Sequence, residues 1–115
     1  MKQLPLRTTK YRLLEKGFKD WLSTLGYSKH TVYGLPYQAR EFLHWLEQQG
    51  ITGVTTITGS NAKDFMEYFR NRKNQRRSGG LSNAHINGQV DCLNKFFDYL
   101  NATGHTDVRV NLTRV

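Results

Sequence analysis

Four stretches of this 115-residue chain carry apolar residues three and four positions apart, the spacing that gives an α-helix one apolar stripe. They cover residues 10–25, 28–49, 60–74 and 82–102. Gly26, Gly50 and Gly104 follow three of them, and glycine readily takes the left-handed conformation that ends many helices. Because each helix is apolar on one face only, the four must cover one another. The sequence therefore predicts an all-α fold, a four-helix orthogonal bundle in one domain.

The second of these helices has an ambiguous start. Ser28 is a good N-cap residue, but Gly34 and Pro36 follow it. A proline inside a helix removes one backbone hydrogen bond and clashes with the preceding turn. Two outcomes are open: a helix from Ser28 with a kink at Pro36, or a helix that properly starts near Pro36, because proline suits a first turn.

The segments outside these helices lack helical spacing. Residues 51–59 are rich in glycine and β-branched residues, but a single strand would have no partner to pair with. We expect an extended connection that inserts Ile51, Val54 and Ile57 into the core. The expected division of the chain is an N-terminal tail at 1–9, a helical domain at 10–104 and a linker toward a further domain at 105–115.

The net charge of +8 attracts polyanions, although it does not determine a fold. Nucleic acid is the first candidate partner and an anionic membrane surface is the second. The membrane is disfavoured, because the basic residues do not lie opposite an apolar, Trp-rich face and no apolar run is long enough to span a bilayer. Cys92 is the single cysteine, which excludes an internal disulfide and favours a reducing, cytoplasmic compartment. It lies beside an apolar stripe, so we expect a buried packing role for it.

The basic residues are distributed unevenly along the chain. Residues 1–27 and residues 51–81 each hold six basic and two acidic residues, whereas 28–50 and 82–115 are balanced. The densest run is 70–77, with five cations and no acid. Two or three cations would satisfy the dipole at a helix C-terminus, whereas five suggest contacts that neutralise phosphates and release counterions. The candidate phosphate contacts are Arg70, Arg72, Lys73, Arg76 and Arg77.

Two of the predicted helices begin with polar side chains. Helix N-termini bind phosphates through free N–H groups and the helix dipole, and Asn, Gln, Lys and His side chains can reach base edges in a major groove. For any one residue, ordinary capping or a solvated face is an equally good explanation. The candidate DNA-binding residues are Lys29, His30, Thr31, Tyr33 and Tyr37 in the second helix, and Ser82, Asn83, His85, Asn87 and Gln89 in the fourth.

Two runs of packing residues resemble those of a known family. Residues 28–46 are similar to the S-x-x-T … F-x-x-W-L helix of tyrosine recombinase (phage-integrase family) core-binding domains, through Ser28, Thr31, Phe42, Trp45 and Leu46. Residues 80–100 resemble a later helix of the same domain, through Gly80-Leu81-Ser82, Ile86, Leu93, Phe96-Phe97 and Tyr99-Leu100. The chain departs from the family at Gly34-Leu35-Pro36, and at Asn111-Leu112, where the family has Asn-Pro.

The resemblance implies a SAM-like helical bundle that clamps one side of double-stranded DNA. In the family the second and fourth helices face the major groove, and here the basic loop at 73–77 would lie along phosphates. The implied partners are duplex DNA and other recombinase protomers bound to it, in a cytoplasmic protein of prokaryotic or phage origin. Cleavage and joining of strands belong to a C-terminal domain of the family.

No catalytic motif is found in this sequence. The family's catalytic domain contains a His-x-x-Arg box, and none of the four histidines here has an arginine three residues later. One cysteine and scattered histidines give no zinc spacing, and there is no phosphate-cradling glycine motif before a lysine. We therefore expect no catalytic residue, no metal and no cofactor in this chain.

Two other functions remain open from the residues alone. A helical protein-interaction adaptor, with its basic loop on an acidic partner, would expose an aromatic patch built from Tyr33, Tyr37 and Tyr68. A free-standing transcription regulator would need a tight helix–turn–helix spacing. The connection at 51–59 and the loop before the fourth helix are too long for that spacing.

Overall fold

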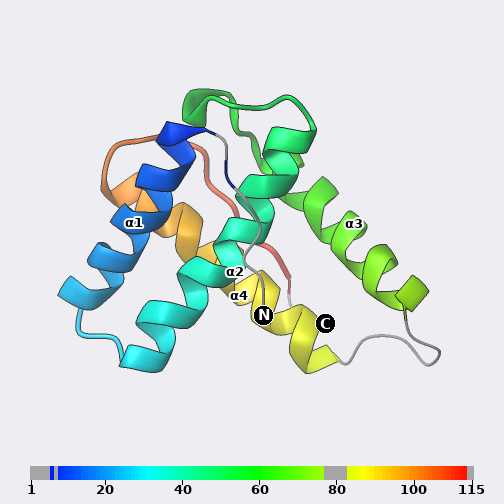
Figure 1. Ribbon diagram of the computed structural model, residues 1–115, viewed down its shortest axis with the longest axis horizontal. Helices are drawn as coiled ribbons and strands as arrows, with labels where there is room; N and C mark the ends of the chain where they lie inside the picture. Colours follow the sequence, from blue (N-terminus) through cyan, green and yellow to red (C-terminus); the bar gives the residue numbers. More distant parts are fainter. Residues whose placement is uncertain (1–5, 7, 77–82, 114–115) are drawn as a thin grey trace.

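The structure, a computed structural model, describes residues 6, 8–76 and 83–113, without the side chains of residues 72–76, 83 and 85. These residues form four α-helices and one short 3-10 turn (Figure 1). The elements are α1 (Thr9–Thr24), α2 (Lys29–Gln48), η1 (Val54–Thr56), α3 (Gly59–Arg76) and α4 (Asn83–Ala102). No strand occurs within the described ranges, so the all-α prediction is confirmed. None of the helices described there has the length and apolar character needed to cross a membrane.

The C-terminal ends of α1, α2 and α4 lie where the sequence predicts them from the positions of glycines. Gly26, Gly50 and Gly104 have φ of 87°, 79° and 77°, the left-handed conformation that side chains with a Cβ rarely adopt. Each chain reversal therefore occurs within one or two residues of the last helical turn. Helices α1, α2 and α4 each end two residues before the glycine that follows them.

The two central helices are α2 and α4. Each of them contacts the other and both α1 and α3, and Figure 1 shows α1 and α3 on opposite sides of the α2–α4 crossing. Four phenylalanines, one from each helix, form a series of edge-to-face contacts across the core. The distance between ring centroids is 5.2 Å for Phe18–Phe96, 6.5 Å for Phe96–Phe42 and 5.3 Å for Phe42–Phe65. All four rings are completely buried. Such pairs stabilise a fold by about 0.5–1.5 kcal/mol each beyond the burial of their surface.

Helix α2 runs through Pro36 as one element. It begins at Lys29, and the Ser28 side chain caps it by accepting a hydrogen bond from the Thr31 backbone N–H at 3.3 Å. The alternative start near Pro36 is therefore wrong. The cap and the buried Val32 side chain stabilise the first turn enough to offset the backbone hydrogen bond that proline cannot donate.

The α2 backbone near this proline is bonded to α4 side chains. The Cys92 thiol donates to the Leu35 carbonyl at 3.3 Å, and the Gln89 amide donates to the Gln38 carbonyl at 3.3 Å. Gly88 lies at the same crossing, where a Cβ would come 3.9 Å from the Gln38 side chain. The small residue and the two polar contacts therefore bring the central helices close together.

The connection between α2 and α3 packs as the sequence predicted. Ile57 is completely buried, and Ile51 and Val54 are partly buried against the core. The one addition is the 3-10 turn, which the Thr56 hydroxyl closes by donating to the Gly53 carbonyl at 2.6 Å.

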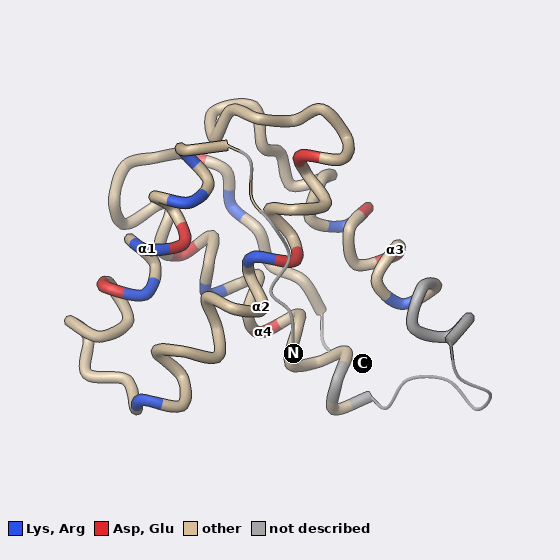
Figure 2. The backbone as a smooth tube through the Cα atoms, viewed as in Figure 1, with Lys and Arg blue, Asp and Glu red and all other residues tan. Residues whose placement is uncertain are grey.

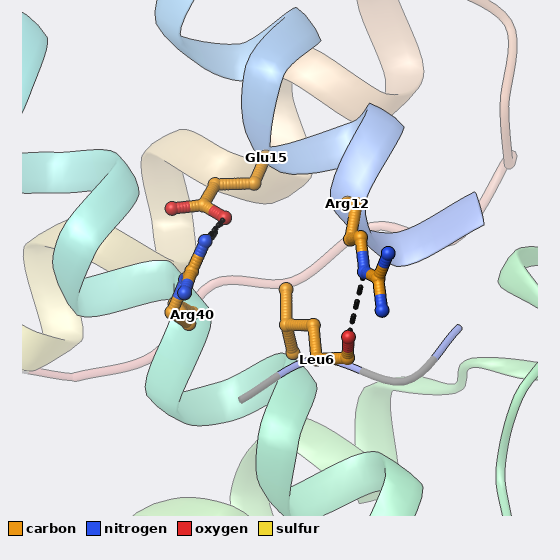
Figure 3. A network of polar contacts seen from close by, with 4 residues as sticks. All are labelled: Leu6, Arg12, Glu15 and Arg40. Carbon is orange, nitrogen blue, oxygen red and sulfur yellow. Dashed lines mark hydrogen bonds and ion pairs between the residues drawn. The ribbon is translucent and has the colours of Figure 1, made fainter. Parts of the chain in front are cut away.

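The N-terminal residues that the structure describes pack against the helices. Leu6 is buried, and its carbonyl accepts a hydrogen bond from Arg12 Nε at 2.7 Å (Figure 3). Nearby, Glu15 of α1 and Arg40 of α2 form an ion pair at 2.6 Å, which is also drawn there. The expected tail at 1–9 is thus anchored at Leu6, just before α1 begins at Thr9.

The C-terminal segment returns along α4. Asn94 of α4 donates its amide to the Leu112 carbonyl at 3.1 Å and accepts from the Leu112 N–H at 2.9 Å. Asn101 donates to the Val108 carbonyl at 2.7 Å, and Val108, Val110 and Leu112 are partly buried against the core. Residues 105–113, expected as a linker, are therefore fixed to the helical domain; that they lead to a further domain stays a prediction.

Candidate nucleic-acid interface

The two longest windows of the sequence without Asp or Glu are residues 21–40 and residues 68–90. The first window includes the start of α2, and the second includes the end of α3 and the start of α4. In Figure 1 these three helix ends all point to the lower edge of the molecule. In Figure 2 the Asp and Glu positions of the described chain lie away from this edge. The fold therefore places parts of the two longest acid-free windows along one edge.

We call this region the cationic edge and define it by residues 29–33 of α2, 70–76 of α3 and 83–87 of α4. Two positive helix N-termini open on it, and backbone N–H groups at such ends favour anions. The α3 segment contributes Arg70, Arg72, Lys73 and Arg76 along the helix backbone. The predicted contacts Arg77 and Ser82 lie outside the described residues.

On α2, three of the predicted residues share one stripe. Lys29, Tyr33 and Tyr37 are four positions apart on a continuous helix, so they lie on the same face. Lys29 is exposed, and the exposed fraction is 61% for Tyr33 and 36% for Tyr37. His30 is also exposed, whereas Thr31 is half-buried and takes part in the Ser28 cap. The structure thus brings Lys29, Tyr33 and Tyr37 together on the surface.

A lysine that the sequence reasoning missed joins this stripe. Lys19 of α1 places its ammonium 4.3 Å from the centroid of the Tyr33 ring, a cation–π contact. Lys19 and Tyr33 are on different helices, and their meeting depends on how α1 packs against α2. No local motif in the sequence could have revealed it.

A second lysine–tyrosine contact lies between the α1–α2 loop and α4. The Lys95 ammonium is 5.3 Å from the centroid of the Tyr27 ring. A hydrogen bond with Tyr27 is the largest cause that raises the pKa of Lys95, and the negative charge of Asp98 also raises it. Lys95 therefore remains a cation at neutral pH.

On α4, one predicted residue does not face solvent. Gln89 is 3% exposed and uses its amide to bond the Gln38 carbonyl, so we remove it from the proposed contacts. Its sequence position already indicated this, because Ile86 and Leu93 stand three residues before and four residues after it on the apolar stripe. Asn87 is half-buried, while the side chains of Asn83 and His85 lie outside the described part of α4.

On α3, Arg70 is half-buried. Its Nε is buried and has no hydrogen-bond partner among the described atoms. The residue lines a groove between α3, α4 and the C-terminal segment, together with Lys63 and Asn111. Buried donors without a partner are rare, so the Arg70 Nε–H is a donor that the described atoms leave unsatisfied.

The groups that could carry chemistry are few in the described residues. No cluster of three or more His, Cys, Asp or Glu residues there could hold a metal ion. Cys92 is completely buried, and burial raises the pKa of its thiol above the ordinary value. A thiol in this state carries little thiolate, the form that acts as a nucleophile, so the packing role expected for Cys92 fits its surroundings.

Comparisons of the chain with family models, with curated proteins and with solved structures find no match.

Proposed function

We propose that this chain binds double-stranded DNA through the cationic edge, with little dependence on base sequence. The observation that supports the proposal is that the two longest acid-free windows, 21–40 and 68–90, lie along one edge that also receives two helix N-termini (Figures 1 and 2). Phosphates would contact the α3 cations and the N–H groups at the starts of α2 and α4.

The finer part of the proposal rests on the family resemblance. The fold would be the SAM-like core-binding module of a site-specific tyrosine recombinase or integrase, and the four packed helices are compatible with it. The starts of α2 and α4 would enter the major groove, where Lys29, His30, Asn83 and His85 can reach base edges. This chain would hold DNA beside other protomers, while a separate catalytic domain would cleave and join strands.

The experiment compares two variants that each remove two positive charges. R72A/R76A changes the cationic edge, and K10A/R109A changes exposed cations at the start of α1 and in the C-terminal segment, outside that edge. Duplex binding is measured by fluorescence anisotropy over a series of salt concentrations. Each lost phosphate contact should reduce the slope of log K against log salt by about 0.9.

We expect R72A/R76A to weaken binding to unrelated duplexes equally and to reduce the slope by about 1 to 2. K10A/R109A should change both quantities much less. Equal effects of the two variants would assign the binding to net charge alone and remove the proposed edge. A wild-type chain that binds no duplex at low salt would end the proposal.

If the wild-type chain binds no duplex, a protein-interaction adaptor becomes the better candidate function. The structure leaves Tyr33, Tyr37 and Tyr68 exposed by 36% or more, as that function requires. Tyr68 lies on α3, however, and packs its ring against Trp45 and Phe65 at 6.2 and 6.1 Å, whereas the other two lie on the α2 stripe. An acidic partner would have to contact two separate groups.

A further inference from the structure

The α2 stripe exposes more aromatic surface than duplex binding requires. Tyr33 is among the most exposed large side chains of the chain, at 61%, and Tyr37 follows one turn later at 36%. Both belong to a regular helix with a capped first turn, so their exposure does not arise from a disordered loop. Tyrosine rings on a surface beside lysines suit a partner that has both flat apolar faces and negative charge.

The arrangement of Lys19 and Tyr33 leaves room for such a partner. The Lys19 ammonium lies 4.3 Å from the ring centroid and covers one face of the ring, while the exposed fraction shows that much of the ring remains accessible. A base that stacks on the open side would place its phosphate near a fixed cation. Lys29 supplies a second cation on the same stripe, four residues before Tyr33.

One acidic residue of α1, a helical turn before Lys19, is already paired with a cation. Glu15 of α1 pairs with Arg40 of α2 at 2.6 Å, and Glu15 stands one helical turn before Lys19. Because that carboxylate is bonded to a guanidinium, it repels an incoming phosphate less than a free carboxylate would. Glu15 is thus a weaker obstacle to a nucleic-acid backbone near Lys19 than a free carboxylate would be.

The spacing of the rings distinguishes a single strand from a duplex. Residues four positions apart on a helix rise by about 6 Å, whereas successive nucleotides of a duplex strand rise by about 3.4 Å. In a duplex each base face is covered by its neighbours, so an exposed ring can stack only on an unpaired base. Tyr33 and Tyr37 together therefore suit an unstacked, extended strand.

We propose that the stripe of Lys29, Tyr33 and Tyr37, together with Lys19, binds single-stranded nucleic acid. The tyrosine rings stack on unpaired bases, and the lysines neutralise the adjacent phosphates. This activity is additional to duplex binding, and it does not depend on the α3 cations of the cationic edge. It accepts any base, because every base presents a flat π-face.

The test uses the full chain and a fluorescein-labelled oligothymidylate of about twelve nucleotides, with a duplex of mixed sequence measured in parallel. Tyr33→Phe keeps the ring and Tyr33→Leu removes it while keeping an apolar side chain. Because Tyr33 is exposed, both variants should fold, which circular dichroism checks. We expect Y33F to bind the oligothymidylate like the wild type, and Y33L to raise the Kd for the oligothymidylate at least about fivefold and by more than it raises the Kd for the duplex.

Lys19→Gln tests the cation separately. It should weaken binding of the oligothymidylate and reduce its salt slope by about 0.7, the effect of one phosphate contact on a single strand. The inference is overturned if the wild type binds only duplex, if Y33L binds the single strand like the wild type, or if Y33F and Y33L lose binding equally. In each of these outcomes R72A/R76A still tests the duplex proposal, so the two ideas fail independently.

Discussion

Replacing Gly17 by alanine should destabilise this protein, although glycine-to-alanine changes inside helices ordinarily stabilise. Gly17 lies in the middle of α1, and a Cβ there would come 2.2 Å from the Tyr99 hydroxyl oxygen and 3.2 Å from Cζ of the same ring. The first distance is far below van der Waals contact. Tyr99 of α4 must move, or α1 must move away from it.

The Tyr99 ring has little freedom to move. It is 4% exposed and contacts the rings of Phe18, Trp21 and Phe96 at 5.5, 5.7 and 6.0 Å. Overpacking of a filled core costs about 1–3 kcal/mol. The helix propensity of alanine offsets about 1 kcal/mol of this. We therefore expect Gly17→Ala to lower the free energy of unfolding by up to about 2 kcal/mol.

Gly34 provides a matched control in α2. It is also inside a helix, but a Cβ there would meet no atom within 4 Å. Gly34→Ala should therefore raise the free energy of unfolding by up to about 1 kcal/mol. Thermal unfolding followed by circular dichroism should show the two variants on opposite sides of the wild type, each shifted by about 4 °C per kcal/mol.

A second substitution tests whether the contact with Tyr99 causes the loss of stability in Gly17→Ala. Tyr99→Phe removes the atom that a Cβ at Gly17 would meet at 2.2 Å, so Gly17→Ala should cost less in that background than in the wild type. A double-mutant cycle measures this coupling. If Gly17→Ala raised the Tm as Gly34→Ala does, the close packing of α1 against Tyr99 would be refuted.

Two further predictions concern single polar contacts. Burial, followed by the negative charge of Glu47, raises the pKa of Tyr11 to about 12 from 10.0. The contribution of Tyr11 to stability should therefore be constant below pH 10.0 and be lost as the pH rises to 12, because the unfolded chain releases this proton first. Urea unfolding at several pH values checks this, and Tyr11→Phe, which also loses the bond to the Ile51 carbonyl at 2.6 Å, should remove that part of the pH dependence. Asn94→Ala should lower the free energy of unfolding by about 1–3 kcal/mol, because it leaves both backbone groups of Leu112 unbonded; faster hydrogen exchange at Leu112 would accompany the loss, and unchanged exchange would contradict it.

Most of the helical architecture could be predicted from the sequence. The apolar stripes that include Phe18, Phe42, Phe65 and Phe96 have a helical period, and a one-sided stripe requires a partner. The ends were predictable because only glycine takes positive φ at little cost. The start of α2 was less certain, since proline and the serine cap favour different starts, and tertiary packing decided between them.

Other features have no local signal in the sequence. The C-terminal segment is fixed by Asn94 and Asn101, and both bond main-chain groups, which every residue offers. The contact between Lys19 and Tyr33 depends on the way two helices pack.

The buried position of Gln89 was predictable from helical periodicity, but the polar character of its side chain suggested exposure. The segments that form the proposed site could therefore be predicted from the sequence more easily than the individual residues that face solvent there.

Asn94 fixes the C-terminal segment through hydrogen bonds to its main chain, and this determines which positions of that segment can vary among related chains. The asparagine recognises an N–H and a carbonyl of the main chain and places no demand on the identity of the side chain there. Asp107, Arg109 and Asn111 are exposed, so a library randomised at these three codons should yield mostly folded proteins. Randomising the codon for Asn94 should yield few, although asparagine is itself a common surface residue.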